Sequence, residues 1–201
     1  MKISEAKKDY YRKLSKEKGF RSRSAYKLIQ LNNSYHILKS GYIVVDIGCA
    51  PGGWLQVAKA AVGYSGMVIG IDIEKVARLD GVTILQGNIQ NTQTINLLNE
   101  ILKGKANILL SDVSPKVSGL WSIDHAQQIS LSKSSLGAAK QILIRGGSAV
   151  LKVFEGEFLK EFKKEAENLF TEIHLTKPKA SRQRSSELYM VCLGFKSSRQ
   201  N

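Results

Sequence analysis

The glycine-rich turn at residues 46–54, with the sequence D-I-G-C-A-P-G-G-W, constrains the fold more than any other part of this chain. An apolar run typical of a buried strand precedes it, and a helical pattern follows it at 53–63. Glycine lets the backbone turn sharply and approach a ligand where a Cβ atom would collide. Such a strand–turn–helix unit presents free N–H groups at the carboxyl edge of a parallel sheet, so it predicts a small-molecule site. The alternative is an ordinary tight turn between a strand and a helix.

From residue 42 onward, strand and helix patterns alternate. Short apolar runs such as Ile108-Leu109-Leu110 are typical of strands covered on both faces. The last two strands are joined by a loop without a helical pattern, so we expect antiparallel neighbours. Strands are expected at 42–47, 67–72, 82–86, 106–111, 147–153, 172–175 and 188–193, and helices at 4–17, 22–36, 53–63, 91–103, 124–144 and 156–170. This order predicts an α/β, Rossmann-like fold: a seven-stranded, mostly parallel sheet with an antiparallel C-terminal hairpin and helices on both faces.

Length and composition fit one globular domain. The chain has 201 residues and no Pro-rich linker or repeat, so we expect a single domain over 1–201 that includes a basic helical segment at 1–38. No apolar run reaches the length of a membrane span, and no signal peptide opens the sequence. The two cysteines, Cys49 and Cys192, have no metal-ligand spacing and indicate no disulfide framework. We therefore expect a metal-free, monomeric cytoplasmic protein with no membrane partner.

Positive charge is concentrated at the two ends of the chain. Residues 1–27 carry ten Lys/Arg against three acids, and residues 176–201 carry six against one, within a net charge of +13. A chain that needs charge only for solubility would spread it, so this distribution predicts a polyanion-binding surface where the termini meet. Two disordered basic tails are the alternative. Charge alone does not separate RNA from DNA or an anionic membrane.

Candidate ligand-binding residues follow the second and third strands. Asp72 ends the second strand, where a carboxylate can accept hydrogen bonds from both hydroxyls of a ribose. Asn88 follows the third strand and can donate to and accept from a base edge, although a plain turn residue is the alternative. Trp54 either packs against the ligand or lies in the core between helix and sheet.

Candidate reacting residues stand at strand ends. Asp112 and Lys152 end the fourth and fifth strands, and Glu187 begins the last. If the last strand is antiparallel, its start lies at the edge where the parallel strands end, so all three side chains face the ligand cleft. A lysine after an apolar strand is unusual because its ammonium sits against a low-dielectric wall, although a structural ion pair is the alternative. Lys27 cannot be placed by this argument.

With these motifs in view, the chain resembles the FtsJ/RrmJ family of S-adenosylmethionine (SAM)-dependent ribose 2′-O-methyltransferases over nearly its whole length. The acid followed by G-x-x-P-G-G looks like the nucleoside-binding turn of SAM enzymes, and it does not match the G-x-G-x-x-G of nicotinamide enzymes. The other matching motifs are R-S-R-S-A-Y-K-L at 21–28, G-I-D at 70–72, S-D-V-S-P at 111–115, L-K-V-F at 151–154 and S-S-E-L-Y at 185–189. Several motifs in order make the resemblance specific.

The resemblance implies transfer of the SAM methyl group to a ribose 2′-hydroxyl. It implies a catalytic set of Lys27, Asp112, Lys152 and Glu187, in which Lys152 accepts the proton. It also implies a SAM pocket lined by Asp46, Gly48, Pro51, Gly52, Gly53, Trp54, Asp72, Asn88 and Asp112. Position 88 departs from the family, which usually carries an acid there.

The expected substrate is RNA, and the preferred hypothesis is a uridine of large-subunit (23S-type) ribosomal RNA. Methylation of tRNA by the same chemistry is one alternative, and a non-catalytic RNA-binding protein with a methyltransferase fold is another. The basic ends would hold phosphates, and Tyr10, Tyr11 and Phe20 would either stack unpaired bases or pack between helices.

Overall fold

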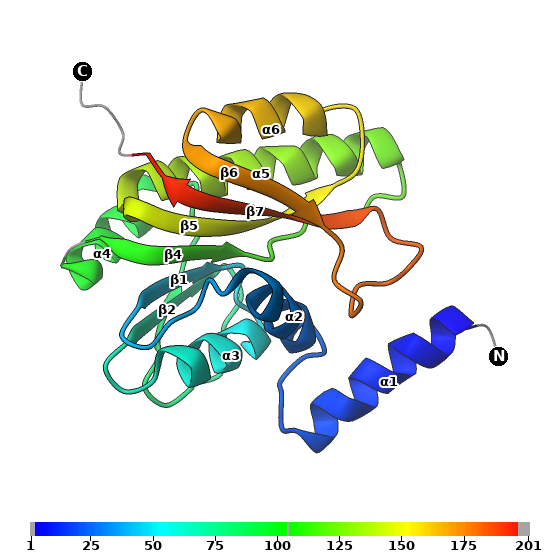
Figure 1. Cartoon of the computed structure of the whole chain (residues 1–201), viewed down its shortest axis with the longest axis horizontal. Coiled ribbons are helices and arrows are strands. Elements are labelled where there is room, and N and C mark those ends of the chain that lie inside the picture. The colour runs from blue at the N-terminus through cyan, green and yellow to red at the C-terminus, as the bar shows by residue number, and fades with distance from the viewer. Residues whose placement is uncertain (1–2, 104, 197–201) are drawn as a thin grey trace.

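Within the described residues, 3–103 and 105–196, seven strands form one mixed sheet in the order β3-β2-β1-β4-β5-β7-β6 (Figure 1). This computed structural model gives side chains from Tyr10 onward. The strands are β1 (Ile43–Ile47), β2 (Met67–Asp72), β3 (Thr83–Gln86), β4 (Ala106–Ser111), β5 (Leu143–Phe154), β6 (Phe170–Thr176) and β7 (Glu187–Phe195). Strands β1 to β5 run parallel, whereas β7 is antiparallel to both β5 and β6. The predicted parallel sheet with an antiparallel C-terminal hairpin is confirmed.

Helices cover both faces of the sheet (Figure 1). They are α1 (Ile3–Glu17), α2 (Ala25–Tyr35), α3 (Gly53–Val62), α4 (Thr92–Leu102), α5 (Trp121–Ile142) and α6 (Leu159–Glu167). Helices α2 and α3 share one apolar core with Val44, and helices α4, α5 and α6 share the other with Val45. Successive side chains of a strand point to opposite faces, so continuous apolar runs are required where both faces are covered. Helix α1 projects from this layered body.

The boundary between α5 and β5 differs from the prediction. Helix α5 ends at Ile142 and β5 begins at Leu143, whereas the sequence predicted a helix to residue 144 and a strand from 147. An apolar run this short fits either a helix or a strand, so periodicity does not locate the boundary. The register between β4 and β5 shifts near this point, and Gly146 takes up the irregularity at φ +81°.

The topology brings the functional strand ends to one edge of the sheet. Strands β1 to β6 end there, and the antiparallel β7 begins there. Phe154, the last residue of β5, pairs with Glu187, the first residue of β7. Residues far apart in the sequence therefore meet at the carboxyl edge, where open α/β sheets bind their ligands.

Candidate active site

The glycine-rich turn packs closely against its own chain. Gly48 and Gly52 have positive φ angles of +74° and +111°, which glycine adopts without strain. A Cβ on Gly48 would lie 2.6 Å from Val113 Cγ1, and one on Gly52 would lie 2.8 Å from Arg21 Nη1. At Gly48 and Gly52, the space that a Cβ would fill is taken by neighbouring segments of the protein, so tight packing of the turn is one reason for glycine at these positions.

Arg21 ties this turn to the loop that follows β2. Its Nη1 donates to Ala77 O at 2.6 Å, and its Nη2 donates to Arg78 O at 2.5 Å. The same guanidinium reaches Pro51 O at 3.4 Å. The linker between α1 and α2 thus braces two segments of the predicted cofactor side.

Three carboxyl groups surround the turn. Asp46 is fully buried, and neither of its oxygens has a hydrogen-bond partner among the described residues. Burial raises the pKa of Asp46 well above its usual value, and the nearby charges of Asp112 and Asp72 raise it further. The Asp72 oxygens accept from Ala50 N and Glu74 N, each at 2.8 Å. Asp72 and Asp112 place negative charge beside the turn, which suits a cationic ligand, whereas burial favours the neutral form of Asp46.

The side chains of two predicted ligand contacts, Trp54 and Asn88, are held by the protein itself. Trp54 is 2% exposed, its Nε1 donates to Ser24 O at 2.8 Å, and its ring lies 5.7 Å from that of Tyr189. Its side chain belongs to the core, so only its backbone is left for a ligand. Asn88 is exposed, and its Oδ1 accepts from Gln90 N at 2.9 Å, a bond typical of a turn.

Asp112, Lys152 and Glu187 meet at the carboxyl edge, as expected from the strand ends. Lys152 Nζ lies 3.5 Å from Asp112 Oδ1 and 3.4 Å from Glu187 Oε2. Lys27, which the sequence could not place, enters from α2, and its Nζ lies 2.7 Å from Glu187 Oε1. The two lysines are 6% and 8% exposed, so two buried ammonium groups and two carboxylates form one compact cluster.

Tyr189 is the member of this cluster that sequence analysis missed. Its hydroxyl donates to Asp112 Oδ1 at 2.6 Å and accepts from Lys27 Nζ at 3.1 Å. It lies two residues after Glu187 on β7, so strand periodicity places both side chains on one face and could have identified it. Burial raises the pKa of Tyr189 well above its usual value, with the charges of Asp112 and Glu187 acting in the same direction.

Glu187 is held ionised at the centre of the cluster. Burial by itself would raise the pKa of Glu187, but the charges of Lys27 and Lys152 and hydrogen bonds from Lys27 and Ser181 lower it to about 2. Ser181 Oγ donates to Glu187 Oε1 at 2.8 Å. Lys27 is the nearer cation, so Glu187 is chiefly paired with Lys27, and Lys152 is the more weakly held of the two lysines.

Helix α5 fixes the backbone of Lys152 from the opposite face of the sheet. The Lys152 carbonyl accepts from Gln128 Nε2 at 3.0 Å and from Ser132 Oγ at 2.7 Å. Gln128 Nε2 also donates to Val113 O at 3.2 Å, next to Asp112. One buried amide therefore sets the spacing between the ends of β4 and β5.

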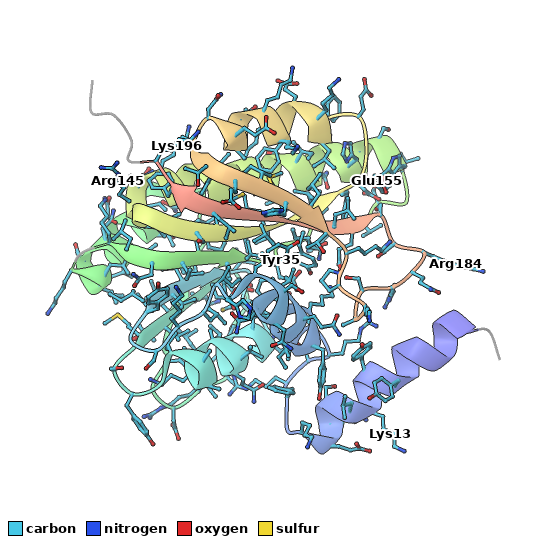
Figure 2. All side chains as sticks on the ribbon, in the orientation of Figure 1. Lys13, Tyr35, Arg145, Glu155, Arg184 and Lys196 are labelled. Atoms are coloured by element: carbon cyan, nitrogen blue, oxygen red, sulfur yellow. The ribbon has the colours of Figure 1, made fainter. Side chains whose placement is uncertain are left out.

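Exposed basic residues border this edge. Lys179, Arg182 and Arg184 lie on the loop between β6 and β7 and are called here the basic rim, and Arg12 and Lys13 are exposed on α1. Figure 2 shows Arg184 at the carboxyl edge together with Glu155, whereas Arg145 and Lys196 lie at the opposite edge.

Gln30 links α1 to the β6–β7 loop. Its Nε2 donates to Tyr11 Oη at 2.9 Å, and its Oε1 accepts from Ala180 N at 3.0 Å.

The prediction that the two chain ends meet at a polyanion-binding surface is therefore wrong for the C-terminal end. The antiparallel β7 carries Lys196 to the amino edge of the sheet (Figure 2), so the β6–β7 loop supplies the positive charge there in place of the C-terminal end. Residues beyond 196 lie outside the described part of the chain.

The aromatic residues near α1 are mostly used in helix packing. The rings of Tyr11 and Phe20 lie 5.4 and 5.6 Å from that of Tyr26 on α2. Tyr10 is 58% exposed, so it alone of the three predicted residues presents most of its surface.

Cys49 and Cys192 are buried free thiols, as expected. Among the described residues, no group of three or more His, Cys, Asp or Glu side chains is arranged to hold a metal ion. None of the described helices has the length and apolarity needed to cross a bilayer.

Comparison with known proteins agrees with this geometry. The family model of FtsJ-like methyltransferases matches residues 20–195. The chain is similar to the ribosomal RNA large subunit methyltransferase E of Nitrosopumilus maritimus, with 50% identity over 97% of this chain and 99% of that protein. The protein of the same name from Cenarchaeum symbiosum is 45% identical over 98% of this chain and 100% of that protein.

Among solved structures, a crystal structure of a putative ribosomal RNA methyltransferase from Plasmodium falciparum is similar, with a TM-score of 0.81 and 34% identity. The match covers 89% of this chain and 100% of that one. The family match spans the turn, the acidic residues and the buried cluster described above. The chain therefore belongs to the FtsJ-like methyltransferase family.

Proposed function

We propose that this protein transfers the methyl group of SAM to a ribose 2′-hydroxyl of large-subunit ribosomal RNA, at a uridine. The observation that carries the proposal is the buried cluster at the carboxyl edge, in which Lys152 lies between Asp112 and Glu187 beside the glycine-rich turn. The names of the relatives support ribosomal RNA as the substrate. The resemblance to the FtsJ/RrmJ family of ribose 2′-O-methyltransferases supports the 2′-hydroxyl as the methyl acceptor and a uridine as its nucleotide.

The residues around the turn fit a cationic nucleoside. When bound, SAM supplies an electrophilic methyl group on a positively charged sulfonium. The neighbouring carboxylates of Asp72 and Asp112 would provide the negative potential that a cation requires, beside the buried and unpartnered Asp46. Asp72 would hold the ribose, because each carboxylate oxygen keeps acceptor capacity beyond its one backbone N–H. The pocket would be lined by the backbone of Gly48, Pro51, Gly52, Gly53 and Trp54. Asn88 would contact the nucleobase of SAM.

The cluster would position the hydroxyl and receive its proton. Lys152 Nζ would hold the 2′-oxygen and, in its neutral amine form, would accept the hydroxyl proton while that oxygen forms its bond to the methyl carbon. The bond between this carbon and the sulfonium sulfur would break at the same time, so that SAM leaves as a neutral thioether. Asp112 and Glu187 fix the direction of Lys152, and Lys27 and Tyr189 hold those carboxylates in place. Alignment of the oxygen with the methyl carbon supplies much of the rate enhancement in a reaction of this type.

Radiolabelled methyl transfer tests the substrate assignment. The purified protein would be incubated with methyl-labelled SAM and, separately, purified large-subunit rRNA, assembled large subunits and tRNA. We expect label on rRNA or on the subunit. Label on tRNA alone would move the protein to the tRNA alternative, and no label on any RNA while SAM binds would favour a non-catalytic RNA-binding protein.

Replacing Asp72 by alanine should weaken SAM binding by roughly tenfold or more, since two ribose hydrogen bonds to a charged acceptor are removed. Isothermal titration calorimetry measures the dissociation constant, and Asp80→Ala, at an exposed acid, is the control. An unchanged dissociation constant would remove Asp72 from the ribose. Because Asp72 also braces the turn through Ala50 N, thermal unfolding of the variant is measured alongside.

Reversing charge on the basic rim should weaken RNA binding and flatten its salt dependence. For Arg182→Glu with Arg184→Glu, the slope of log affinity against log salt should fall by roughly 0.7–0.9 for each phosphate that the protein no longer neutralises. Arg145→Glu with Lys196→Glu, at the opposite edge in Figure 2, is the matched control. Equal effects of the two pairs would mean that RNA does not bind preferentially at the rim.

A further inference from the structure

Four aromatic rings stack next to the catalytic cluster. Trp121 and His125 belong to the first turns of α5, Phe154 ends β5, and Phe158 follows it. The Trp121 ring lies 5.9 Å from Phe154 at 23° and 5.7 Å from His125 at 18°. The His125 and Phe158 rings lie 5.4 Å apart at 6°. All three pairs are close to parallel, so the rings form one stack, called here the aromatic stack.

The aromatic stack is connected to the ends of β4 and β5, which carry Asp112 and Lys152. Phe154 lies two residues beyond Lys152, roughly 7 Å along β5, and it pairs with Glu187. The loop from Asp112 leads directly to Trp121. Asp124 holds this loop, accepting from Ser118 N at 2.7 Å and Gly119 N at 3.2 Å. The position of Trp121 is therefore fixed relative to the cluster.

Two rings of the stack remain open to solvent. Trp121 is 49% exposed and Phe158 is 41% exposed, whereas His125 is 3% exposed. The open rings line a cavity of about 430 Å³ together with Ile123 and Glu157, within the range of small-ligand pockets. Stability of the domain does not require half-exposed Trp and Phe rings, and contiguous apolar surface of this kind marks a binding site.

The chemistry of the cavity selects a neutral flat ring. Glu157 and the nearby Glu155 repel a phosphate group. His125 Nε2 accepts from Phe158 N at 3.1 Å, so the ring proton of the neutral form is on Nδ1, which has no partner among the described residues. Burial lowers the pKa of His125 and keeps it neutral. Because Nδ1 is itself buried, the surface open to a ligand is that of Trp121 and Phe158 beside acidic side chains, which suits an uncharged aromatic ring such as a nucleobase.

We propose that Trp121 and Phe158 stack an unpaired base of the RNA strand whose ribose is held at Lys152. The inference rests on the proposed function and adds a base-binding site to it. Contacts to phosphates alone would let the RNA strand slide along the protein. A base held by stacking would fix one nucleotide opposite Lys152. Base–aromatic stacking tolerates any base, so this site would hold the base without selecting its identity.

Tryptophan fluorescence tests the site independently of catalysis. The chain has two tryptophans, and Trp54 is 2% exposed, so a ligand that reaches the surface quenches chiefly Trp121. We expect oligouridine to quench the tryptophan emission of the wild type. The emission of Trp121→Phe, which comes from Trp54, should stay nearly unchanged. An abasic oligomer of the same length should bind the basic rim without quenching. Equal quenching by both oligomers would overturn the proposal.

Steady-state kinetics on large-subunit rRNA complete the test. Trp121→Ala should weaken RNA binding roughly tenfold or more, Trp121→Phe should retain most affinity, and SAM affinity should not change in either. Tyr64→Ala, at a fully exposed aromatic between α3 and β2, is the control. Wild-type rates for Trp121→Ala would refute the base site while leaving the proposed function intact. A wild type that methylates no RNA would instead refute the proposed function.

Discussion

Replacing Lys152 by alanine is expected to lower the rate of methyl transfer by roughly 10²- to 10⁴-fold, the usual contribution of a positioned acid–base group. The lysine ends β5 at 8% exposure, and its ammonium is directed by Asp112 and Glu187. Without it, the 2′-hydroxyl has neither a positioning group nor a proton acceptor. The dissociation constant for SAM should stay near the wild-type value, because Lys152 makes no contact with the glycine-rich turn in this account.

The control for this prediction is Lys133→Ala, at an exposed lysine of α5 that pairs with Glu165. It should leave the rate unchanged. Single-turnover methyl transfer and calorimetric SAM titration separate chemistry from cofactor binding. If Lys152→Ala unfolds the protein, or weakens SAM binding as much as it slows transfer, the lysine has a structural role instead.

Replacing Glu187 by glutamine is expected to cost about 3–5 kcal/mol of unfolding free energy at neutral pH, since it leaves buried ammonium groups without their shared carboxylate. The folded-state pKa of about 2 lies below the ordinary 4.5. Its contribution to stability, about 3 kcal/mol, is therefore fully present above pH 4.5 and is lost as the pH falls toward 2. The deficit of the variant should shrink over the same interval.

Urea unfolding at several pH values between 7 and 3 measures this deficit. Glu165→Gln, which removes a half-exposed partner of Lys133, is the matched control and should cost less than about 1 kcal/mol at any pH. A deficit for Glu187→Gln that does not change with pH would mean that Glu187 is not held ionised by the two lysines.

The fold could be predicted because its apolar runs are unambiguous. Val44 and Val45 face different cores, which requires the continuous apolar strand pattern seen in the sequence. The helix-free connection before β7 predicted the antiparallel hairpin. The boundary at Ile142 could not be predicted, since the apolar run there suits either a helix or a strand.

The site could be predicted where strand ends define it. Asp112, Lys152 and Glu187 follow from topology alone. Lys27 could not be placed, because its helix precedes the alternating pattern and its packing depends on tertiary contacts. Tyr189 was missed although strand periodicity pairs it with Glu187.

The glycine and charge patterns predicted a tight turn and a basic surface, but not which residues pack against the turn or form the surface. The sequence shows that Gly52 must lack a Cβ, but not that Arg21 fills the space. It shows basic residues near both ends, but the antiparallel direction of β7 carries Lys196 away from the site. The contact of Arg21 and the course of β7 both depend on three-dimensional neighbours that no local pattern encodes.

The position of the transferred methyl group tests the central claim most directly. Unmodified large-subunit rRNA would be incubated with the protein and SAM, hydrolysed in alkali and enzymatically, and its nucleosides identified by mass spectrometry. The account predicts 2′-O-methyluridine, an alkali-resistant linkage 3′ to it, and the absence of both products with Lys152→Ala. A methyl group on a base, with the ribose unmodified, would contradict it.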